Sequence, residues 1–398
     1  MPDKTPDRPR IFLNNVHLKG SKSIEDLSID FQKGLNILIG KNGSGKSNFM
    51  EFLYEVMLSK RNDKFLFNYA RIELVSNDSH SFVIELEKEF HSKIIKKDFD
   101  DGNELLRRFF IDGEILFDSA NDEYSKKTVE FKNEKIKYIG NLRGLFAKLG
   151  YSYLYPLYIK FTLPDNLEGI NIPGSIRASL GNPFINLSYP DTLGFMDDIF
   201  FNMDSFAGDA IDTIRQITKS ELLEDLVIQE EIINNLKLYT TVEDARFNDN
   251  INLYNDEKSV VIENIKLEFK INGSWLPWSQ LSDGTKRLFY IISEVTNSTG
   301  LILIEEPELG VHPHQFNLLM NFLKEQSEDK QIIISTHAPK ALDHLSPDEL
   351  NNILITSYSS KKGTQMRHLN PKEIKKAKRY QKEVGFFSDY WLLSDLEE

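Results

Sequence analysis

Three short, almost wholly apolar runs stand out along the chain, and each is followed at once by polar residues. The runs are residues 35–39, 301–304 and 332–334. A continuous apolar run of this length is typical of a strand that is buried on both faces of a parallel sheet. Because ligands of open α/β sheets bind at the carboxyl ends of the strands, we expect the polar residues after each run to form one site.

Segments with helical spacing of their apolar residues accompany the runs. Residues 47–60 follow the first run, residues 288–295 precede the second, and residues 313–324 connect the second run to the third. Two apolar runs joined by a helix predict a βαβ unit with parallel strands. The pattern therefore predicts an α/β protein in which helices flank a mixed sheet.

The residues after the first run have the pattern G-x-x-x-x-G-K-[ST] of the phosphate-binding loop, the Walker A motif. Backbone N–H groups of this loop surround the phosphates of a nucleoside triphosphate, and the dipole of the following helix adds to the attraction. Lys46 should reach the β- and γ-phosphates, and Ser47 should bind Mg²⁺. The flanking strand and helix argue against a chance glycine turn. The predicted ATP-binding residues of the loop are Gly40, Asn42, Gly43, Ser44, Gly45, Lys46, Ser47 and Asn48.

Two carboxylates, Glu305 and Glu306, follow the second run. Neighbouring side chains on a strand point to opposite faces, so the two should have different roles. Glu305 stands where Mg²⁺ is coordinated, together with Ser47. Glu306 is the candidate base that orients and deprotonates the attacking water. Taken alone, both could be solvated residues that begin a loop; the phosphate-binding loop in the same chain favours the catalytic interpretation.

His337 follows the third run and should lie near Glu306, within reach of the γ-phosphate. A single histidine is more often structural, but its position after the strand favours a catalytic role. His312 and His314 form an H-x-H pair without a cysteine or a third ligand nearby, which is weak evidence for a metal site. We interpret them as loop residues.

A polar turn at residues 281–287 lies before the helix that precedes the second run. By itself, its Ser282 could simply cap that helix. Its L-S-x-G form, and its position ahead of the double glutamate, are similar to the signature motif of ABC-type ATPases. The chain thus resembles that family over residues 10–60 and 275–345.

The resemblance is closest to the RecF, OLD and SMC-like branch. The sequence EEPELGVHP at residues 305–313 is similar to that of OLD-like ATPases in anti-phage systems such as Gabija, Septu and PARIS. The resemblance implies a P-loop ATPase of ABC type with a two-lobed head that uses ATP and Mg²⁺. It further implies two copies paired head to tail, each closing its signature motif over the nucleotide held by the other.

Residue roles can be carried over by position. The resemblance places Ser282 and Gly284 on the γ-phosphate held by the other copy, and residues 308–311 in the D-loop at the dimer seam. It makes Glu306 the catalytic base and His337 the switch histidine. Two features depart from the family pattern. The Mg²⁺ position more often holds Asp than Glu, and no Q-loop glutamine can be placed.

Composition limits the partners. The 398-residue chain carries 48 basic and 61 acidic residues, a formal net charge of −13. A general nucleic-acid binder is basic overall, so DNA could be contacted only locally. Lysines gather at residues 93–137 and on a predicted C-terminal helix at residues 372–382, and solvated faces that balance acids elsewhere explain both groups better than DNA contact does. Without a secretion signal, a membrane-spanning run of ~20 apolar residues or any cysteine, we expect a cytoplasmic protein with no membrane partner.

The motifs divide the chain into three predicted regions. Residues 1–90 form ATPase lobe I with Walker A, residues 91–250 an insertion of strands and then helices, and residues 251–398 lobe II with signature, Walker B, D-loop and switch histidine. No sustained heptad repeat occurs, so we expect a compact, mostly helical insertion that serves dimerisation or sensing, unlike the long coiled coil of SMC proteins. The aromatic stretch 385–393 should pack on the sheet; a docking patch is the alternative.

OLD and Gabija-type nucleases add a C-terminal Toprim domain. The sequence continues for 61 residues beyond His337, too few for that domain, so we expect any nuclease to be a separate subunit. The predicted function is an ATP-hydrolysing, ATP-gated dimer that controls a separately encoded nuclease or toxin in anti-phage defence. Two alternatives stay open. One is a RecF-like DNA-repair ATPase that clamps duplex DNA. The other is a scaffold that keeps ATP bound, hardly turns it over and sequesters a toxin.

Overall fold

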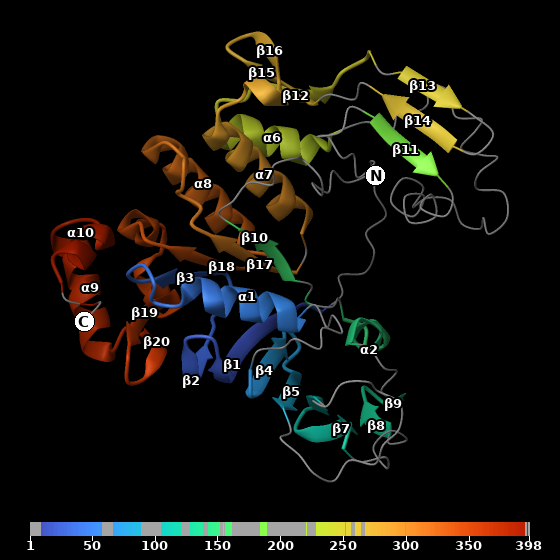
Figure 1. Cartoon of the computed structure of the whole chain (residues 1–398). Coiled ribbons are helices and arrows are strands. Elements are labelled where there is room, and N and C mark those ends of the chain that lie inside the picture. Colours follow the sequence, from blue (N-terminus) through green and yellow to red (C-terminus); the bar gives the residue numbers. More distant parts are fainter. Residues whose placement is uncertain are drawn as a thin grey trace. The chain divides into compact units, whose positions relative to one another are not determined.

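The computed structural model describes residues 9–57, 67–88, 105–120, 128–137, 142–151, 154, 156–160, 184–188, 220, 228–250, 252–255, 259–263, 267–298, 300–394 and 396. The chain forms two compact units, and each is built from separate stretches of the sequence. Figure 1 labels the helices and strands. The first unit contains Met1–Ile159, Thr299–Pro307 and Ser327–Glu398; the second contains Lys160–Ser298 and Glu308–Gln326. The predicted boundaries at residues 90 and 250 stay a prediction.

A twelve-stranded sheet forms the centre of the first unit, in the order β10-β17-β18-β3-β19-β20-β2-β1-β4-β5-β6-β7. Its first five strands are parallel to one another. They are β10 (Pro156–Ile159), β17 (Leu301–Glu305), β18 (Gln331–Thr336), β3 (Leu35–Ile39) and β19 (Ile353–Ser359). Every residue of β17, β18 and β3 is buried, which confirms the three apolar runs as buried parallel strands.

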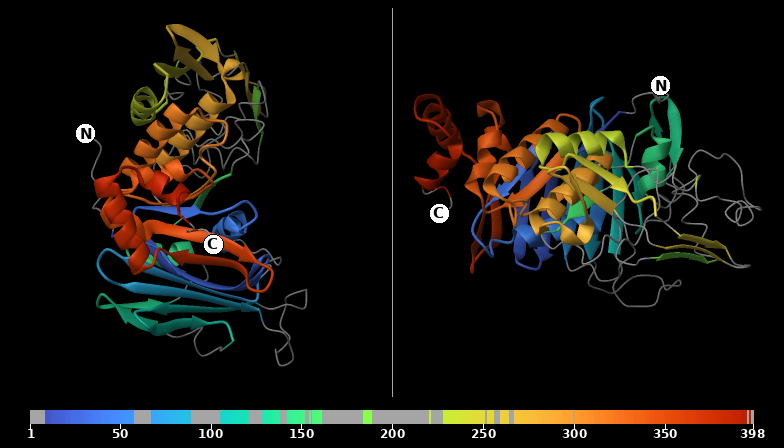
Figure 2. Two further views of the ribbon diagram at one scale, coloured as in Figure 1. Left: turned by 90° about the vertical axis from the view of Figure 1, so that its left-hand side faces the viewer. Right: turned by 90° about the horizontal axis from the view of Figure 1, so that it is seen from above.

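The other half of the sheet is antiparallel, and Figure 2 shows its blue to teal strands side by side. These strands are β20 (Gly363–His368), β2 (Ile24–Asp30), β1 (Ile11–Ser21), β4 (Tyr69–Ser76), β5 (Ser81–Lys88), β6 (Leu105–Ile111) and β7 (Glu114–Asp118). Burial alternates residue by residue along β4, as expected for a strand with one face on a core. Asp112 and Gly113 make the predicted turn between β6 and β7 with positive φ angles of 49° and 82°.

Helix α1 (Lys46–Met57) follows the glycine-rich loop directly. Phe49, Leu53 and Val56 belong to its buried face and lie in the same hydrophobic cluster as residues of β1 and β4. The helix was predicted to continue to residue 60; residues 58–66 lie outside the described part of the chain.

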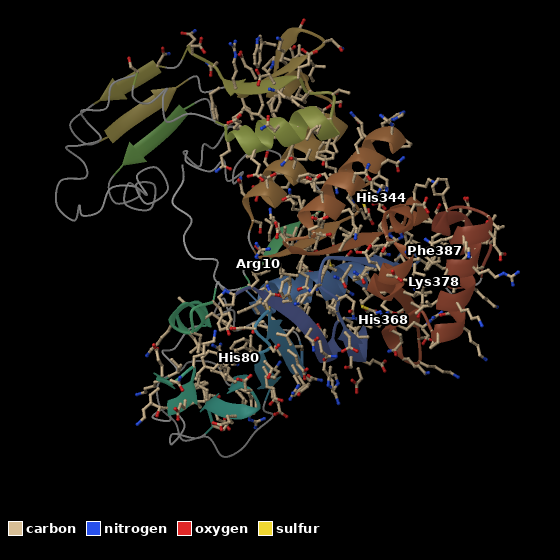
Figure 3. The ribbon with its side chains drawn as sticks, turned by 180° about the vertical axis from the view of Figure 1, so that it is seen from behind. Arg10, His80, His344, His368, Lys378 and Phe387 are labelled. Atoms are coloured by element: carbon tan, nitrogen blue, oxygen red, sulfur yellow. The ribbon has the colours of Figure 1, made fainter. Side chains whose placement is uncertain are left out.

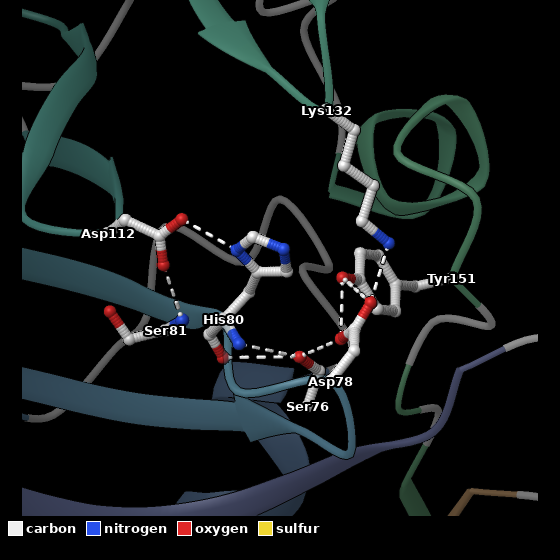
Figure 4. A network of polar contacts seen from close by, with 7 residues as sticks. All are labelled: Ser76, Asp78, His80, Ser81, Asp112, Lys132 and Tyr151. Atoms are coloured by element: carbon white, nitrogen blue, oxygen red, sulfur yellow. Dashed lines mark hydrogen bonds and ion pairs between the residues drawn. The ribbon is translucent and has the colours of Figure 1, made fainter.

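A polar network ties the turn after β4 to later segments of the first unit (Figure 4). The elements nearby are β8 (Thr128–Phe131), β9 (Glu134–Lys137) and α2 (Leu142–Lys148). The carboxylate of Asp78 accepts hydrogen bonds from the Lys132 amine at 2.6 Å and the Tyr151 hydroxyl at 2.8 Å. Burial alone would raise the pKa of Asp78, but these bonds and one from Ser76 hold it below its ordinary value. The ionised carboxylate therefore joins the β8–β9 hairpin to the main sheet.

The C-terminal segment contains the basic helix α9 (Pro371–Glu383) and the short helix α10 (Phe387–Leu392). Figure 3 labels Lys378 on the first and Phe387 on the second. Phe387 and Trp391 are buried, and the packing of this aromatic stretch on the sheet stays a prediction. Four other large apolar side chains are 60–79% exposed, and together we call them the C-terminal apolar patch: Val384, Phe386, Leu392 and Leu393.

Two short 3₁₀ helices, η3 (Pro339–His344) and η4 (Pro347–Asn352), connect β18 to β19. The Asp343 carboxylate of η3 accepts hydrogen bonds from the backbone N–H and the hydroxyl of Ser388, each at 2.8 Å. This contact anchors α10 to the segment that directly follows the site described below.

The second unit contains two small sheets and three helices, and the three helices contact one another. The helices are α6 (Glu230–Tyr239), α7 (Asp283–Asn297) and α8 (Pro313–Gln326), and η2 (Trp278–Gln280) precedes α7. One sheet pairs β12 (Asp244–Phe247), β15 (Leu267–Ile271) and β16 (Ser274–Pro277); the other pairs β11 (Phe184–Ser188), β14 (Ser259–Glu263) and β13 (Asn252–Asn255).

Helices α7 and α8 confirm the two downstream helices predicted from periodicity. The later part of the insertion, where residues 196–238 have a helical pattern, is described at residue 220 and over residues 228–238, and α6 begins there at Glu230. The remainder of that stretch lies outside the described residues. The described part of the predicted insertion holds strands as well as helices. None of the helices in the described ranges is both long and apolar enough to cross a membrane.

Candidate nucleotide-binding site

The carboxyl ends of the parallel strands bring the predicted site residues together. In the register of the sheet, Glu305 of β17 pairs with Ser335 of β18, and Thr336 of β18 pairs with Ile39 of β3. The glycine-rich loop, the two glutamates and His337 therefore leave three neighbouring strands at one edge. The sequence expectation that the three strand exits lie together is confirmed.

Two loop glycines are required by close contacts within the first unit. A Cβ on Gly40 would lie 2.0 Å from the backbone oxygen of Thr356, and a Cβ on Gly45 would lie 2.0 Å from the Thr364 hydroxyl. Gly45 also has a φ of 98°, which disfavours any side chain. Gly43, with a φ of 75°, has open space where a side chain would begin. The loop is thus pressed against β19 and β20 on one side and is open at Gly43.

Lys46 lies under the loop and is 5% exposed. Its amine donates hydrogen bonds to the backbone oxygens of Gly40 at 2.7 Å and Lys41 at 3.2 Å. The neighbouring Ser44 hydroxyl is buried and has no hydrogen-bond partner among the described residues. Ser47 is exposed in the first turn of α1, where backbone N–H groups lack partners within the helix. These donors fit a polyphosphate, because a polyphosphate offers many acceptor oxygens and has no hydrogen-bond donors of its own.

Asn48 belongs to a group of hydrogen-bonded side chains beside the loop. Its amide donates to the Ser23 hydroxyl at 2.8 Å, and this hydroxyl lies 2.8 Å from the hydroxyl of Thr364. Ser23 and Thr364 were not predicted from the sequence, because each is a single hydroxyl on a strand or turn without a motif. Asn42 is exposed at the tip of the loop.

Glu305 ends β17 and is 2% exposed. The Tyr158 hydroxyl of the neighbouring strand β10 donates a hydrogen bond to its Oε1 at 2.7 Å. Burial, and then this bond, raise the pKa of Tyr158, so its hydroxyl keeps the proton that it donates. Tyr158 is absent from the sequence prediction because β10 has only four residues and carries no motif.

Glu306 leaves the strand by a left-handed turn. Its φ is 44°, uncommon for a residue with a side chain, and its N–H donates to the backbone oxygen of Ser335 at 2.8 Å. Glu305 and Glu306 lie in different environments: Glu305 is buried, and the side chain of Glu306 is 31% exposed. The turn at Glu306 adds to the alternation along the strand in separating the two side chains, and their different roles stay a prediction.

His337 joins Glu306 to the loop lysine. Its Nε2 lies 3.2 Å from Oε1 of Glu306, and its Nδ1 lies 3.4 Å from the Lys46 amine. An ammonium group only donates hydrogen bonds, so Nδ1 is the acceptor and the ring proton belongs on Nε2, facing Glu306. The contacts form a chain from Lys46 through His337 to Glu306. This geometry was expected for His337 and Glu306; the roles of all three stay predictions.

The signature segment lies in the second unit, at the start of α7. Ser282 caps this helix: its hydroxyl accepts a hydrogen bond from the Thr285 N–H at 3.2 Å. A Cβ on Gly284 would lie 2.6 Å from the backbone oxygen of Gly310, so the predicted signature and D-loop segments touch within this unit. Both Ser282 and Gly284 thus have a structural role within the second unit. Whether they also contact a nucleotide on another copy stays a prediction.

The H-x-H pair shows no sign of a metal centre. His312 precedes α8, and its Nδ1 accepts a hydrogen bond from the His314 N–H at 3.3 Å. His314 belongs to the first turn of α8 and not to the predicted loop. Across the described ranges, no three His, Asp or Glu side chains are grouped as they would be around a metal ion. In the predicted basic stretch at residues 93–137, the Lys132 amine donates a hydrogen bond to the Asp78 carboxylate.

Comparison with known proteins agrees with this geometry. Residues 35–343, more than half of the chain, match the family model described as "AAA domain, putative AbiEii toxin, Type IV TA system". The chain belongs to this family. The predicted fold class, an ABC-type P-loop ATPase with a mixed sheet and flanking helices, is confirmed.

Several curated relatives are similar to this family member. The "Retron Vc95 probable ATPase" of Vibrio cholerae is 22% identical over 88% of this chain and 75% of its own length. The "DNA double-strand break repair Rad50 ATPase" of Methanococcus maripaludis is 25% identical over 65% of this chain. The RecF protein of Clostridium beijerinckii is 25% identical over 58% of this chain. The chain spans about a quarter of the Rad50 protein and about half of RecF.

Among solved structures, the SMC head domain of Thermotoga maritima aligns with 90% of this chain and 99% of its own at a TM-score of 0.47 and 12% identity. An Smc head domain from Pyrococcus furiosus aligns with 94% of this chain and 99% of its own, at a TM-score of 0.48 and 15% identity. The family match supports the ABC-type assignment; the narrower OLD-like assignment is a proposal.

Proposed function

We propose that this chain is an ATP-hydrolysing subunit that closes as an ATP-gated, head-to-tail dimer and controls a separately encoded effector, a nuclease or a toxin, in anti-phage defence. The observation that carries the enzymatic part is the contact chain from Lys46 through His337 to Glu306 at the edge where nucleotides bind in open α/β sheets. The similarity to a retron ATPase supports the defence role. The effector and the trigger lie beyond the chain itself.

Each side chain of the site has a proposed task. Lys46 exchanges its bonds to loop oxygens for bonds to the β- and γ-phosphates. Glu306 accepts a proton from the attacking water, and His337, whose Nε2 lies 3.2 Å from Glu306 Oε1, orients that carboxylate. Ser47 and Glu305 would hold Mg²⁺, which supplies positive charge to the phosphate oxygens.

The dimer part of the proposal rests on the second unit. The signature and D-loop segments, which the resemblance assigns to the seam, contact each other at Gly284 and Gly310. Leu309 belongs to the D-loop segment and exposes 47% of its surface. A single exposed leucine is common, but this one stands where the second copy is expected.

The decisive experiment compares Glu306→Gln with wild type. A general base typically contributes a factor of about 10²–10⁴, so hydrolysis should fall by that range while ATP affinity stays within about threefold. Light scattering after gel filtration should then show an ATP-stabilised dimer in the variant. Glu328→Gln, at an exposed glutamate of the same unit, is the matched control. Normal turnover in Glu306→Gln would assign the base to another residue, and an ATP-independent monomer would refute the gated dimer.

The effector is proposed to dock at the C-terminal apolar patch. Helix α9 beside the patch carries six basic and two acidic residues in a chain whose net charge is −13. Lys372, Lys375, Lys376 and Lys382 are exposed there. An apolar patch rimmed by positive charge is complementary to an acidic amphipathic segment of another protein.

A photo-cross-linking amino acid at position 393 tests this surface in cells, with position 358 as the control, because Tyr358 is 56% exposed outside the patch. We expect position 393 alone to capture a protein that, once purified, binds wild type and loses at least tenfold in affinity for Leu393→Ser. Cross-links only to lipid or to a second copy of this chain would refute the docking proposal.

A DNA clamp is the second candidate, favoured by the names of the Rad50 and RecF relatives and by the exposed lysines of α9. It predicts hydrolysis that duplex DNA stimulates, and stimulation that falls steeply between 50 and 200 mM salt, as expected when phosphate contacts release counterions. A slow rate that does not respond to DNA favours the effector-controlling ATPase.

A further inference from the structure

A tyrosine of the neighbouring strand contacts the carboxylate that is predicted to hold Mg²⁺. Tyr158 of β10 donates its hydroxyl proton to Glu305 Oε1 at 2.7 Å. Strand β10 is the parallel neighbour of β17, and Tyr158 pairs with Leu303 in the register. Tyr158 and Glu305 therefore point to the same face of the sheet, two positions apart along the strands.

The ring of Tyr158 is held in turn by the helix that follows the glycine-rich loop. Its centroid lies 5.2 Å from that of Tyr54 in α1, and the two rings are inclined by 47°. One side chain thus connects α1, which begins with Lys46 and Ser47, to the carboxylate at the end of β17. Both groups predicted to hold Mg²⁺, Ser47 and Glu305, are positioned through elements that Tyr158 contacts.

A buried carboxylate without donors is costly, so Tyr158 could act as a structural partner alone. Its position argues for more. A hydrogen bond to Oε1 fixes the rotation of the carboxylate, and groups that orient a metal ligand typically contribute a factor of 10–100 in metal affinity. In addition, β10 ends at Ile159, and the chain passes into the second unit at Lys160. The orienting group therefore stands next to one of the places where the chain passes between the two units.

We propose that Tyr158 is a positioning residue that orients Glu305 toward the divalent cation of the bound nucleotide. This rests on the proposed metal role of Glu305. Because β10 ends one residue before Lys160, a displacement of the chain at Lys160 would reach the Mg²⁺ ligand through β10 and this hydrogen bond.

Tyr158→Phe removes only the hydroxyl, and Tyr54→Phe is the matched control, because the Tyr54 hydroxyl has no hydrogen bond within the described ranges. The affinity for Mn²⁺ is measured by electron paramagnetic resonance with saturating AMP-PNP, and AMP-PNP affinity is measured separately in EDTA. We expect Tyr158→Phe to weaken Mn²⁺ binding about 10–100-fold, while metal-free AMP-PNP affinity stays within about twofold. Tyr54→Phe should change neither affinity.

Competition with Mg²⁺ and Ca²⁺ separates orientation from mere stability. Mg²⁺ demands near-octahedral ligands and Ca²⁺ tolerates irregular ones, so Tyr158→Phe should lose more affinity for Mg²⁺ than for Ca²⁺. Equal losses for the two cations, or wild-type Mn²⁺ affinity in Tyr158→Phe, would overturn the proposal. Wild-type Mn²⁺ affinity in Glu305→Gln would instead refute the metal role of Glu305, on which the proposed function depends.

Discussion

Replacing Lys46 with alanine tests the nucleotide site most directly. In the structure, the Lys46 amine donates to two loop oxygens, Gly40 O at 2.7 Å and Lys41 O at 3.2 Å. On binding, we expect two bonds to anionic phosphate oxygens to replace these two bonds to uncharged backbone oxygens. Bonds between two charged groups contribute about 1.5–3 kcal/mol each, and we take about 1 kcal/mol for each bond to an uncharged oxygen. The net loss in the variant is therefore about 1–4 kcal/mol.

This free energy corresponds to an ATP affinity lowered roughly 5- to 1000-fold. The affinity is measured by isothermal titration calorimetry, and circular dichroism verifies that the variant is folded. Lys41→Ala is the matched control, because Lys41 is an exposed lysine of the same loop, and its affinity should stay within about threefold. Unchanged affinity in folded Lys46→Ala, or an equal loss in Lys41→Ala, would refute the assignment of the phosphate-binding lysine.

Three further predictions concern the framework of the site. Asp78→Asn removes a carboxylate whose folded pKa is held below its ordinary value, chiefly by Lys132 against the effect of burial; its stabilisation is complete above about pH 4 and is lost as the pH falls through the folded pKa. The difference in urea midpoint from wild type should therefore shrink below pH 4, and a difference constant down to pH 3 would contradict this. Gln331→Met breaks three hydrogen bonds to the main chain, two of them buried, and should lower the free energy of unfolding by about 2–5 kcal/mol in urea titrations; a loss below 1 kcal/mol would contradict it. Gly284→Ala should lower the melting temperature, because its Cβ would lie 2.6 Å from Gly310 O, and the overpacking costs about 1–3 kcal/mol. An unchanged melting temperature would show that the backbone at Gly310 moves away without cost and would contradict the prediction.

Local pattern was enough to predict the centre of the sheet. The strands β3, β17 and β18 are apolar at nearly every position and each precedes a recognisable polar group, so both their burial and their common edge followed from the sequence. Helices α7, α8 and α9 were likewise visible from periodicity and charge. The glycine-rich loop carries its own chemical signature, which depends on spacing alone.

Contacts between distant segments could not be predicted in this way. Tyr158 and Glu305 are separated by 147 positions, and nothing in the four residues of β10 marks the tyrosine as their meeting point. Ser23 and Thr364 meet beside the loop across 341 positions. The left-handed turn at Glu306 is a tertiary effect too, because its N–H is paired with Ser335 of another strand. These residues surround the predicted ones and set their orientation.

The place of β3 in the sheet has a consequence for synthesis of the chain. Its two neighbours, β18 and β19, are made about 300 residues later, whereas β1 pairs with β2, and β4 to β7 pair in succession. Pairing of distant segments must overcome the entropy of closing long loops, and it is slow compared with hairpin formation. During translation β1, β2 and β4 to β7 can pair early, while β3 and the glycine-rich loop that follows it still lack their partner strands. The nascent chain therefore cannot complete a nucleotide site, or any ATP-dependent assembly, until β18 and β19 have also left the ribosome.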